Sequence, residues 1–414
     1  MTRLGDAADM LVGFAFKSAG FLDAEADGIP LVRGDNVQQG YIRWGDKTKK
    51  WPIAEVDEFE RYQLTVDDVI LAMDRPIVGD GLKMAWIKPD DLPCLLVQRV
   101  CRLRGKPNVA LTRFIRYVLA APAFSDHIHR ITTGANIPHI SGKDIAAYEF
   151  HLPGIDEQAA VVECLSAYDD LIATNQRRIA LLEDAARHVY REWFVHLRFP
   201  GHESASVNGG MPEGWHIQAL SAIAEVNARS VGSKEQPDSV LYIDISSVTP
   251  GSVGAMTEYA FSAAPGRARR RVSHGDVIWS CVRPNRRSYA LIWQPAENVV
   301  VSTGFAVLSA AQVPFSYLYL ATTTDEFVGY LERNATGAAY PAVTSKIFED
   351  AEVICPDTDT LDSFNKFVLP MLSQMETLKA QNASLARARD LLLPKLMAGK
   401  LDVSTIRLPE EATT

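Results

Sequence analysis

Clustered arginines in the second half of this chain could donate hydrogen bonds to nucleic-acid bases or phosphates. Arg283 follows an apolar stretch, and the turn after it contains Asn285, Arg286 and Arg287. A guanidinium can donate two parallel hydrogen bonds to guanine O6 and N7 or to phosphate oxygens. A solvated turn whose arginines pair with neighbouring carboxylates would contain the same residue types. The cluster is therefore a candidate binding site, with a solvent-exposed turn as the alternative.

Two further groups of basic residues are candidates for contact with a nucleic-acid backbone. They are Arg267, Arg269, Arg270 and Arg271, before the same apolar stretch, and Lys47, Lys49 and Lys50, in the first half. A dense arginine run supplies charge rather than positional information, so it fits phosphate contacts better than base contacts. The lysines lie between Trp44 and Trp51. A packed tryptophan pair beneath a solvated loop would explain them equally well.

An internal repeat places some of these basic residues at matched positions. Thr133-Gly134-Ala135, Pro138, Lys143 and Pro153 reappear 203 positions later as Thr336-Gly337-Ala338, Pro341, Lys346 and Pro356. With a shift of 208, Asp68-Val69-Ile70 and Arg75-Pro76 match Asp276-Val277-Ile278 and Arg283-Pro284. Arg75 is therefore the counterpart of Arg283, and the hypothesis of nucleic-acid contact extends to it, with an ion pair to Asp74 as the alternative. Lys143 and Lys346 could likewise contact nucleic acid or cap the strand that follows.

Each copy of the repeat predicts a compact α+β module, over residues 1–154 and 199–357. Both stretches alternate short apolar runs with Gly, Pro and Asp turns and then continue into a helical-looking segment. The copies share a strand and its exit turn, whereas the segments between them differ, as in a duplicated scaffold with divergent loops. We expect two related binding modules with different preferences.

A long helix is predicted after each module, over residues 155–198 and 358–405, with a tail at 406–414. Apolar residues recur there at steps of three and four, the spacing that keeps one seam against a partner helix. The seams are Leu165, Tyr168, Ile172, Asn175, Ile179, Leu182, Ala186, Val189 and Trp193, and Met371, Met375, Leu378, Asn382, Leu385, Arg389, Leu392 and Leu396. The pattern favours an antiparallel coiled coil over two core helices of a larger bundle.

Prolines and asparagines interrupt the apolar pattern of the two predicted helices. Pro370 and Pro394 lie in the second run, and proline removes a hydrogen bond and clashes with the preceding turn. We expect that helix to begin near Pro370 and to kink or end near Pro394. Each seam also carries one asparagine, Asn175 or Asn382, which can fix the register of a coiled coil.

Composition is that of an ordinary soluble protein of about two to three domains, with 414 residues, 47% hydrophobic and 22% charged. We expect it in the cytoplasm, because no stretch approaches the ~20 apolar residues of a membrane span and MTRLGDAADM lacks a signal-peptide pattern. Five scattered cysteines without a Cys-x-x-Cys pair predict neither disulfides nor zinc. The formal net charge of −9 means that local clusters would have to bind any nucleic acid.

Three segments resemble the conserved regions of specificity subunits of type I restriction-modification systems. They are IDEQAAVVECLSAYDDLIATNQRRIALLEDAARHVYREWFVHLRF (155–199), PEGWHIQALSAIAEV (212–226) and RARDLLLPKLMAGKLDV (387–403). The helical segments are the most specific, and the module interiors match only in general plan. The resemblance implies two tandem target recognition domains separated by two long antiparallel coiled-coil helices, with a pseudo-two-fold internal repeat.

The resemblance also implies a non-catalytic subunit that recognises a bipartite, asymmetric target in double-stranded DNA, one half per domain. Helix length would then set the spacing of the half-sites. Two modification (methyltransferase) subunits and two restriction or motor subunits would be its partners. They would supply the cofactors, S-adenosylmethionine, ATP and Mg, so none is expected in this chain. In agreement, the sequence contains no Gly-x-x-x-x-Gly-Lys-Ser/Thr loop, His-Glu-x-x-His pair or Asn/Asp-Pro-Pro-Tyr/Phe tetrapeptide.

Two other functions remain open from the sequence. Similar modules could form the recognition subunit of a type IIG or IIB-like modification-restriction system, and the helices could belong to a coiled-coil adaptor without a DNA role. A split methylated motif in host DNA would exclude the adaptor.

Overall fold

The computed structural model describes residues 1–79, 81–132, 138–232, 236–403, 406 and 409, and the chain divides into two compact units. One unit comprises residues 1–174 and 382–414, and the other comprises residues 175–381. Thr133-Gly134-Ala135 and most of the tail predicted at 406–414 lie outside the described residues. The unit boundary falls within the two long helices, so each unit contains one α+β module and a part of each helix.

A four-stranded antiparallel sheet forms the centre of the first module. Its order is β2 (Ala8–Val12), β10 (Val100–Gly105), β5 (Val69–Ala72) and β8 (Met84–Trp86). All four residues of β5 are buried, because α2 (Thr112–Ala120) and α3 (Pro122–Ile131) cover one face and apolar loop residues cover the other. A strand that is buried on both faces is apolar at every position, whereas a strand with one solvated face alternates apolar and polar residues.

The remaining elements of this module are shorter. They are β3 (Ile29–Val32) between β4 (Lys50–Trp51) and β9 (Leu95–Leu96), the pairs β1 (Thr2–Arg3) with β11 (Glu149–Phe150) and β6 (Ile77–Val78) with β7 (Gly81–Leu82), and the helices α1 (Leu4–Ala7) and α4 (Gly142–Ala146).

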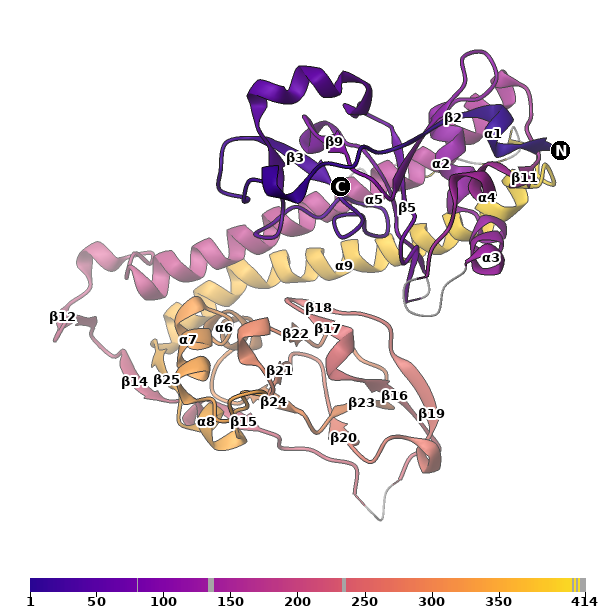
Figure 1. The fold of residues 1–414 in the computed structure, drawn as a ribbon. Coiled ribbons are helices and arrows are strands. Elements are labelled where there is room, and N and C mark those ends of the chain that lie inside the picture. Colours follow the sequence, from indigo (N-terminus) through magenta and orange to yellow (C-terminus); the bar gives the residue numbers. More distant parts are fainter. Residues whose placement is uncertain (80, 133–137, 233–235, 404–405, 407–408, 410–414) are drawn as a thin grey trace. The chain divides into compact units, whose positions relative to one another are not determined.

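The second unit repeats this plan, as the sequence predicts. Its four-stranded sheet has the equivalent order β15 (Ala224–Val226), β24 (Phe305–Ala310), β21 (Val277–Ser280) and β22 (Tyr289–Leu291). A second sheet contains β19 (Thr257–Ala260), β16 (Ser239–Ile243), β23 (Val299–Ser302) and β20 (Ala268–Arg271), and β16 and β23 are parallel as β3 and β9 are. Figure 1 shows α6 (Phe315–Ala321), α7 (Asp325–Asn334) and α8 (Ser345–Glu349) beside the four-stranded β15–β22 sheet. The short pairs are β14 (His216–Ala219) with β25 (Glu352–Cys355), β12 (Val207–Asn208) with β13 (Met211–Pro212), and β17 (Val248–Thr249) with β18 (Ser252–Val253).

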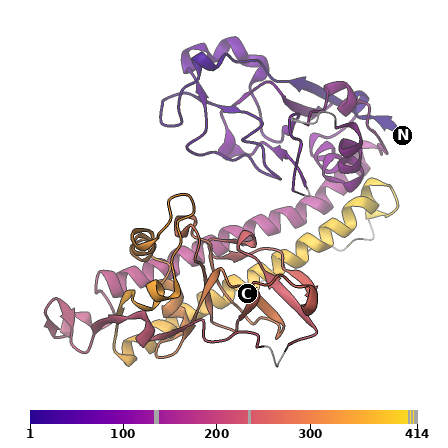
Figure 2. The ribbon, with the colours of Figure 1, turned by 60° about the horizontal axis from the view of Figure 1, so that its bottom comes forward.

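The two long helices are α5 (Ile155–Tyr190) and α9 (Thr358–Met397), both continuous in Figure 2. None of the predicted seam residues is exposed. In the first unit, Leu165 of α5 shares a core cluster with Leu396 of α9, and in the second unit Ala186 shares one with Met375. The start of α5 therefore meets the end of α9 in one unit, and the reverse holds in the other, so the helices are antiparallel as predicted.

The expectation that the second helix begins near Pro370 is wrong. α9 begins at Thr358, where the preceding Asp357 carboxylate accepts a hydrogen bond from the Thr360 backbone N–H over 2.9 Å. Pro370 leaves the carbonyl of Lys366 without its helical donor, but both residues are exposed, so water can satisfy it. An exposed proline therefore costs the helix less than the rule assumes.

A buried ionic network connects the first module to both helices. Arg116 of α2 and Arg389 of α9 both donate to the Asp169 carboxylate of α5, Arg389 over 2.7 Å. The Tyr117 hydroxyl donates to the same carboxylate over 2.8 Å, and the Arg116 guanidinium lies 4.0 Å from the centroid of the Trp86 ring. The network holds β8 and α2 against the helices and so positions the loops at the end of the sheet.

Replacing Asp169 with Ala should lower the free energy of unfolding by about 3 kcal/mol, because the Arg116 charge would stay buried without a counter-ion. The Arg116 side chain is only 10% exposed. Asp170→Ala removes the same charge from the exposed next residue and should cost less than ~0.5 kcal/mol. Chemical denaturation followed by circular dichroism measures both variants. Equal effects would contradict a stabilising network.

Candidate nucleic-acid interface

The Arg-Pro motif and the loop with the second repeated proline lie next to each other in both units. The backbone N–H of Arg75 donates to the carbonyl of Pro138 over 2.7 Å, and that of Arg283 donates to the carbonyl of Pro341 over 2.6 Å. The two arginines have φ values of +46° and +52°. Each Arg-Pro turn is therefore bonded to the loop that ends in the matched proline. We call this arrangement the paired-loop site, residues 74–76 with 138–139 in the first unit and 282–287 with 336–342 in the second.

Left-handed backbone makes the two arginines unusual. This conformation costs roughly 1–2 kcal/mol for a residue with a Cβ atom, and glycine is its common occupant. A turn that keeps arginine there in both copies fixes the direction in which its Cα–Cβ bond leaves the backbone, at the end of a buried strand.

Buried aspartates anchor the strands that carry these turns. Asp68 precedes β5 and accepts hydrogen bonds from Arg104, one of them over 2.7 Å. Asp276 precedes β21 and accepts from Arg229 and from the Ser309 hydroxyl, each over 2.7 Å. Burial raises the pKa of Asp276, and the bonds from Ser309 and Arg229 offset part of that effect. The anchors fix the start of each strand, and the paired loops fix its end.

In the second unit, Arg283 is stacked on an exposed tyrosine. Its guanidinium lies 4.4 Å from the centroid of the Tyr340 ring and donates to the carbonyl of Ala339 over 3.3 Å. Tyr340 is 68% exposed although it is aromatic. An exposed aromatic ring with a guanidinium on its face is a surface suited to stacking on bases.

The other side chains of this turn divide into bound and available groups. Arg287 forms an ion pair with Asp325 over 2.5 Å. Asn285 and Arg286 are exposed, and within the described part of the chain their side chains make no hydrogen bond or ion pair. Arg283, Asn285 and Arg286 are thus the groups of this turn that could reach a ligand.

The arginine run before this turn does not form one surface. Arg269 to Arg271 lie in β20, where the register against β23 shifts between Ala268 and Arg270. This irregularity interrupts the row of side chains along the strand. Arg269 stacks at 4.7 Å on the Phe261 ring, and burial lowers the pKa of Arg270, whose Nε has no hydrogen-bond partner. Arg271 is partly buried, and Arg267 is exposed. Arg267 is the member placed best for phosphate contact.

The lysine loop of the first unit is largely engaged within the protein. Lys49 forms an ion pair with Asp23, and the Lys50 ammonium donates to the carbonyl of Ala26 over 2.8 Å. Lys47 is exposed. The suggested tryptophan pair is not formed, because Trp44 donates to Asp91 over 2.8 Å and Trp51 packs in another cluster with Phe16 and Phe59.

Arg75 is free of the neighbour that could have neutralised it. The Asp74 carboxylate accepts hydrogen bonds from Arg99 and His139, each over 2.6 Å, and does not pair with Arg75. Burial raises the pKa of Asp74, but these two bonds outweigh burial and bring it below its ordinary value. The Arg75 side chain is exposed and, among the described residues, makes no hydrogen bond.

The matched lysines differ between the units. Lys143 in α4 is exposed, and none of the described residues pairs with it. Lys346 in α8 pairs with Asp350 over 2.7 Å, which raises the pKa of its ammonium. Of these two lysines, Lys143 is the one whose ammonium can bind a ligand without first breaking an ion pair.

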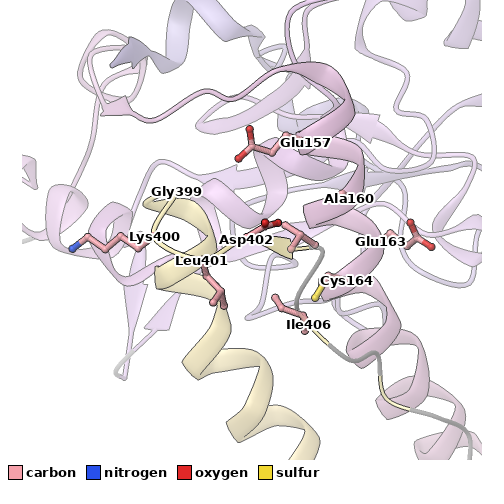
Figure 3. A pocket seen from close by; sticks show the side chains of 10 residues that line it. Glu157, Ala160, Glu163, Cys164, Gly399, Lys400, Leu401, Asp402 and Ile406 are labelled. Atoms are coloured by element: carbon pink, nitrogen blue, oxygen red, sulfur yellow. The ribbon is translucent and has the colours of Figure 1, made fainter.

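No described group of His, Cys, Asp and Glu side chains is arranged to hold a metal ion. A cleft of about 810 Å³ lies between the start of α5 and residues 399–403 and 406. Figure 3 shows that its polar side chains Lys400 and Glu163 extend to opposite sides. None of the predicted binding residues lines it. Of the described helices, none is long and apolar enough to cross a membrane.

Sequence reasoning missed Tyr340 and Lys83. Tyr340 directly precedes the repeated Pro341, so an aromatic residue inside the repeat was a usable signal. Lys83 gave no signal, because only the structure shows that this lysine is 8% exposed beside the Arg75 turn.

The family model of the "Type I restriction modification DNA specificity domain" matches residues 1–184. Over 174 residues the chain is 36% identical to the type I restriction enzyme EcoAI specificity subunit of Escherichia coli, covering 42% of this chain and 28% of that protein. It is 27% identical over 189 residues to the MjaVIII specificity subunit of Methanocaldococcus jannaschii, covering 46% of this chain and 44% of the other. The chain thus spans less than half the length of these two relatives. The crystal structure of a type I restriction-modification S subunit from M. genitalium shares the fold, with a TM-score of 0.56, 15% identity and 95% of each chain covered.

Asp74 should make the free energy of unfolding of the first module depend on pH. Its pKa is lowered in the folded chain, so its stabilising effect is present above the ordinary value of 3.8 and is lost as the pH falls through the folded pKa. Asp74→Asn should therefore reduce the loss of stability between roughly pH 5 and pH 3. Thermal unfolding across this range tests it, with exposed Asp46→Asn as the charge-matched control. The prediction fails if the pH profile of Asp74→Asn matches that of the unchanged protein.

Proposed function

We propose that this chain, whose residues 1–184 match the family model of the type I restriction modification DNA specificity domain, is the sequence-reading subunit of a type I system. It recognises a split, asymmetric target in double-stranded DNA and catalyses no reaction itself. The observation that carries this proposal is the paired-loop site, which occurs once in each unit with the same backbone bond. Two such sites with different side chains suit a target with two different halves.

The two sites supply different groups to DNA. In the second unit, Arg283, Asn285 and Arg286 face a half-site, with Tyr340 available for stacking. In the first unit, Arg75 has the equivalent place. The exposed Arg267, Lys47 and Lys143 add phosphate contacts, which position the protein without reading sequence. Because the net charge is −9, partner subunits contribute much of the attraction to phosphate.

The long helices connect the two reading units and bind the partners. Each helix continues from one unit into the other and rises ~1.5 Å per residue, so helix length sets the spacing of the half-sites. Two methyltransferase subunits dock on the exposed apolar residues of these helices, Leu181, Phe367 and Leu391, which are 68%, 55% and 67% exposed. Two restriction subunits complete the complex. S-adenosylmethionine, ATP and Mg belong to these partners.

A recognition subunit of a type IIG or IIB-like system would use the same paired-loop sites, and the family match to a type I domain favours the type I assignment. A coiled-coil adaptor without a DNA role leaves the free arginines of both sites unexplained.

Replacing Arg283 and Arg286 together with Ala should weaken DNA binding and relax base preference in only one half of the target, by about 1–3 kcal/mol per lost base contact. The measurement is co-expression with the methyltransferase subunit and sequencing of methylated positions in host DNA. Exposed Arg333→Ala in α7 is the control for loss of charge from the same unit. Loss of preference in both halves would contradict independent reading units.

Replacing Leu391 or Leu181 with Asp should weaken assembly with the methyltransferase at least about ten-fold, because a charge would enter an apolar contact. Ile217→Asp, at a position 56% exposed in β14, is the matched control. Analytical ultracentrifugation of the mixed subunits measures the effect. Unchanged assembly for both helix variants would exclude these residues from the docking surface.

A further inference from the structure

Lys83 is a buried lysine of the first unit whose ammonium has no partner among the described residues. It directly precedes β8, and its side chain belongs to a residue that is only 8% exposed. Its ammonium makes no hydrogen bond or ion pair to any described residue, yet its nitrogen is not fully enclosed. Removing an ammonium from water is costly unless an acceptor replaces the water. The structure therefore shows a reachable cation whose acceptor is missing.

Packing explains why the side chain is buried. Alternate residues of a strand share a face, so Lys83 lies on the same face as Ala85 and Ile87. Those two residues pack in a cluster with Val37 and Ile42, from the loop of residues 35–43. The Lys83 hydrocarbon stem extends this apolar row, and its neighbours there offer the ammonium no acceptor. A lysine that only extends its stem along apolar surface is the simpler alternative.

The charges around Lys83 argue against that alternative. Burial lowers the pKa of its ammonium, Asp35 and Asp74 raise it, and Arg43 and Arg75 lower it further. Geometry also places the Arg75-Pro76 turn beside it, because the Lys83 backbone N–H donates to the carbonyl of Pro76 over 2.7 Å. The charges of Arg43 and Arg75 repel the ammonium. Their repulsion is tolerable when an anion or another strong acceptor binds all three groups.

Neither nearby acid fills that role. Asp74 already accepts hydrogen bonds from Arg99 and His139. The Asp35 side chain is 84% exposed and lies 3.9 Å from Arg33. Among the described residues, no group therefore accepts from the Lys83 ammonium, and a ligand can supply the acceptor.

We propose that Lys83, together with Arg43 and Arg75, binds a hydrogen-bond acceptor of DNA and thereby helps to read the half-site of the first unit. This inference rests on the proposed function. Arg75 belongs to the paired-loop site, so Lys83 extends that site toward the loop of residues 35–43. The same loop carries Tyr41, which is 49% exposed. The acceptor is either a phosphate oxygen or a guanine O6 or N7.

The equivalent position in the second unit has a different residue. The Ala72 N–H donates to the Lys83 carbonyl over 2.9 Å, and the matched Ser280 N–H donates to the Ser288 carbonyl over 2.9 Å. One backbone position thus presents an ammonium in one unit and a hydroxyl in the other. A residue that differs at an otherwise matched place is suited to distinguish the two half-sites.

The test uses the complex with its methyltransferase subunits and a duplex carrying the motif that the unchanged complex methylates. Lys83→Met keeps the stem and removes the charge. Arg43→Gln removes the charge of an exposed residue whose guanidinium donates to the carbonyl of Asp35 over 3.3 Å. Lys88→Met is the matched control, because exposed Lys88 follows the other end of β8. Affinity is measured at several salt concentrations, methylated motifs are sequenced, and thermal unfolding checks each variant.

We expect Lys83→Met and Arg43→Gln to weaken binding about ten-fold, and Lys88→Met to stay within about two-fold. A changed base preference in one half-site identifies a base edge as the acceptor. Equal weakening on all sequences, with a salt slope smaller by about one, identifies a phosphate. Unchanged affinity and preference for Arg43→Gln and for folded Lys83→Met would overturn this inference. A complex of the unchanged chain that methylates no split motif would overturn the proposed function instead.

Discussion

The hydrogen bond from the arginine N–H to the proline carbonyl determines where each unit can present basic side chains. It joins Arg75 to Pro138 and Arg283 to Pro341, with nearly the same length in both units. The bond holds a turn at the end of a buried strand and keeps arginine in a left-handed conformation that it adopts rarely. Without the bond, the turn would lose a contact that stabilises this conformation, and the Cα–Cβ bonds of the two arginines would lose a fixed direction.

The basic residues of the predicted set divide into those that are paired within the protein and those that remain available to a ligand. Lys49, Lys50, Arg287 and Lys346 are engaged by acceptors of their own unit. An ion pair with an outside ligand would first have to break these contacts, so such residues contribute little to binding. Other basic or amide side chains make no hydrogen bond or ion pair to a described residue, and among them are Lys47, Arg75, Lys83, Lys143, Arg267, Asn285 and Arg286. This distribution reconciles a net charge of −9 with local binding of an anionic partner.

Periodicity and repeats predicted the fold class, because they reflect backbone geometry. The steps of three and four predicted the seams, and no seam residue is exposed. The start of α9 was missed because the proline rule ignores whether the orphaned carbonyl faces water, as it does at Lys366. The binding residues stay predictions. Sequence alone could not separate Lys49 from Lys47, or find Lys83, because acceptors such as Asp23 come from distant parts of the chain.

Separate cores let the two sites differ without conflict. The cluster that contains Phe114 and Leu396 belongs to the first unit, and the one that contains Trp279 and Met375 belongs to the second. A change at Lys83 or Ser288 therefore alters one site and leaves the packing of the other intact. The constraints common to both units are the arginine–proline bond and the helical seam, which involve backbone atoms and a spacing of apolar residues rather than the side chains that would meet a ligand. A scaffold with these constraints can keep its fold while the side chains of each unit change and give that unit its own ligand preference.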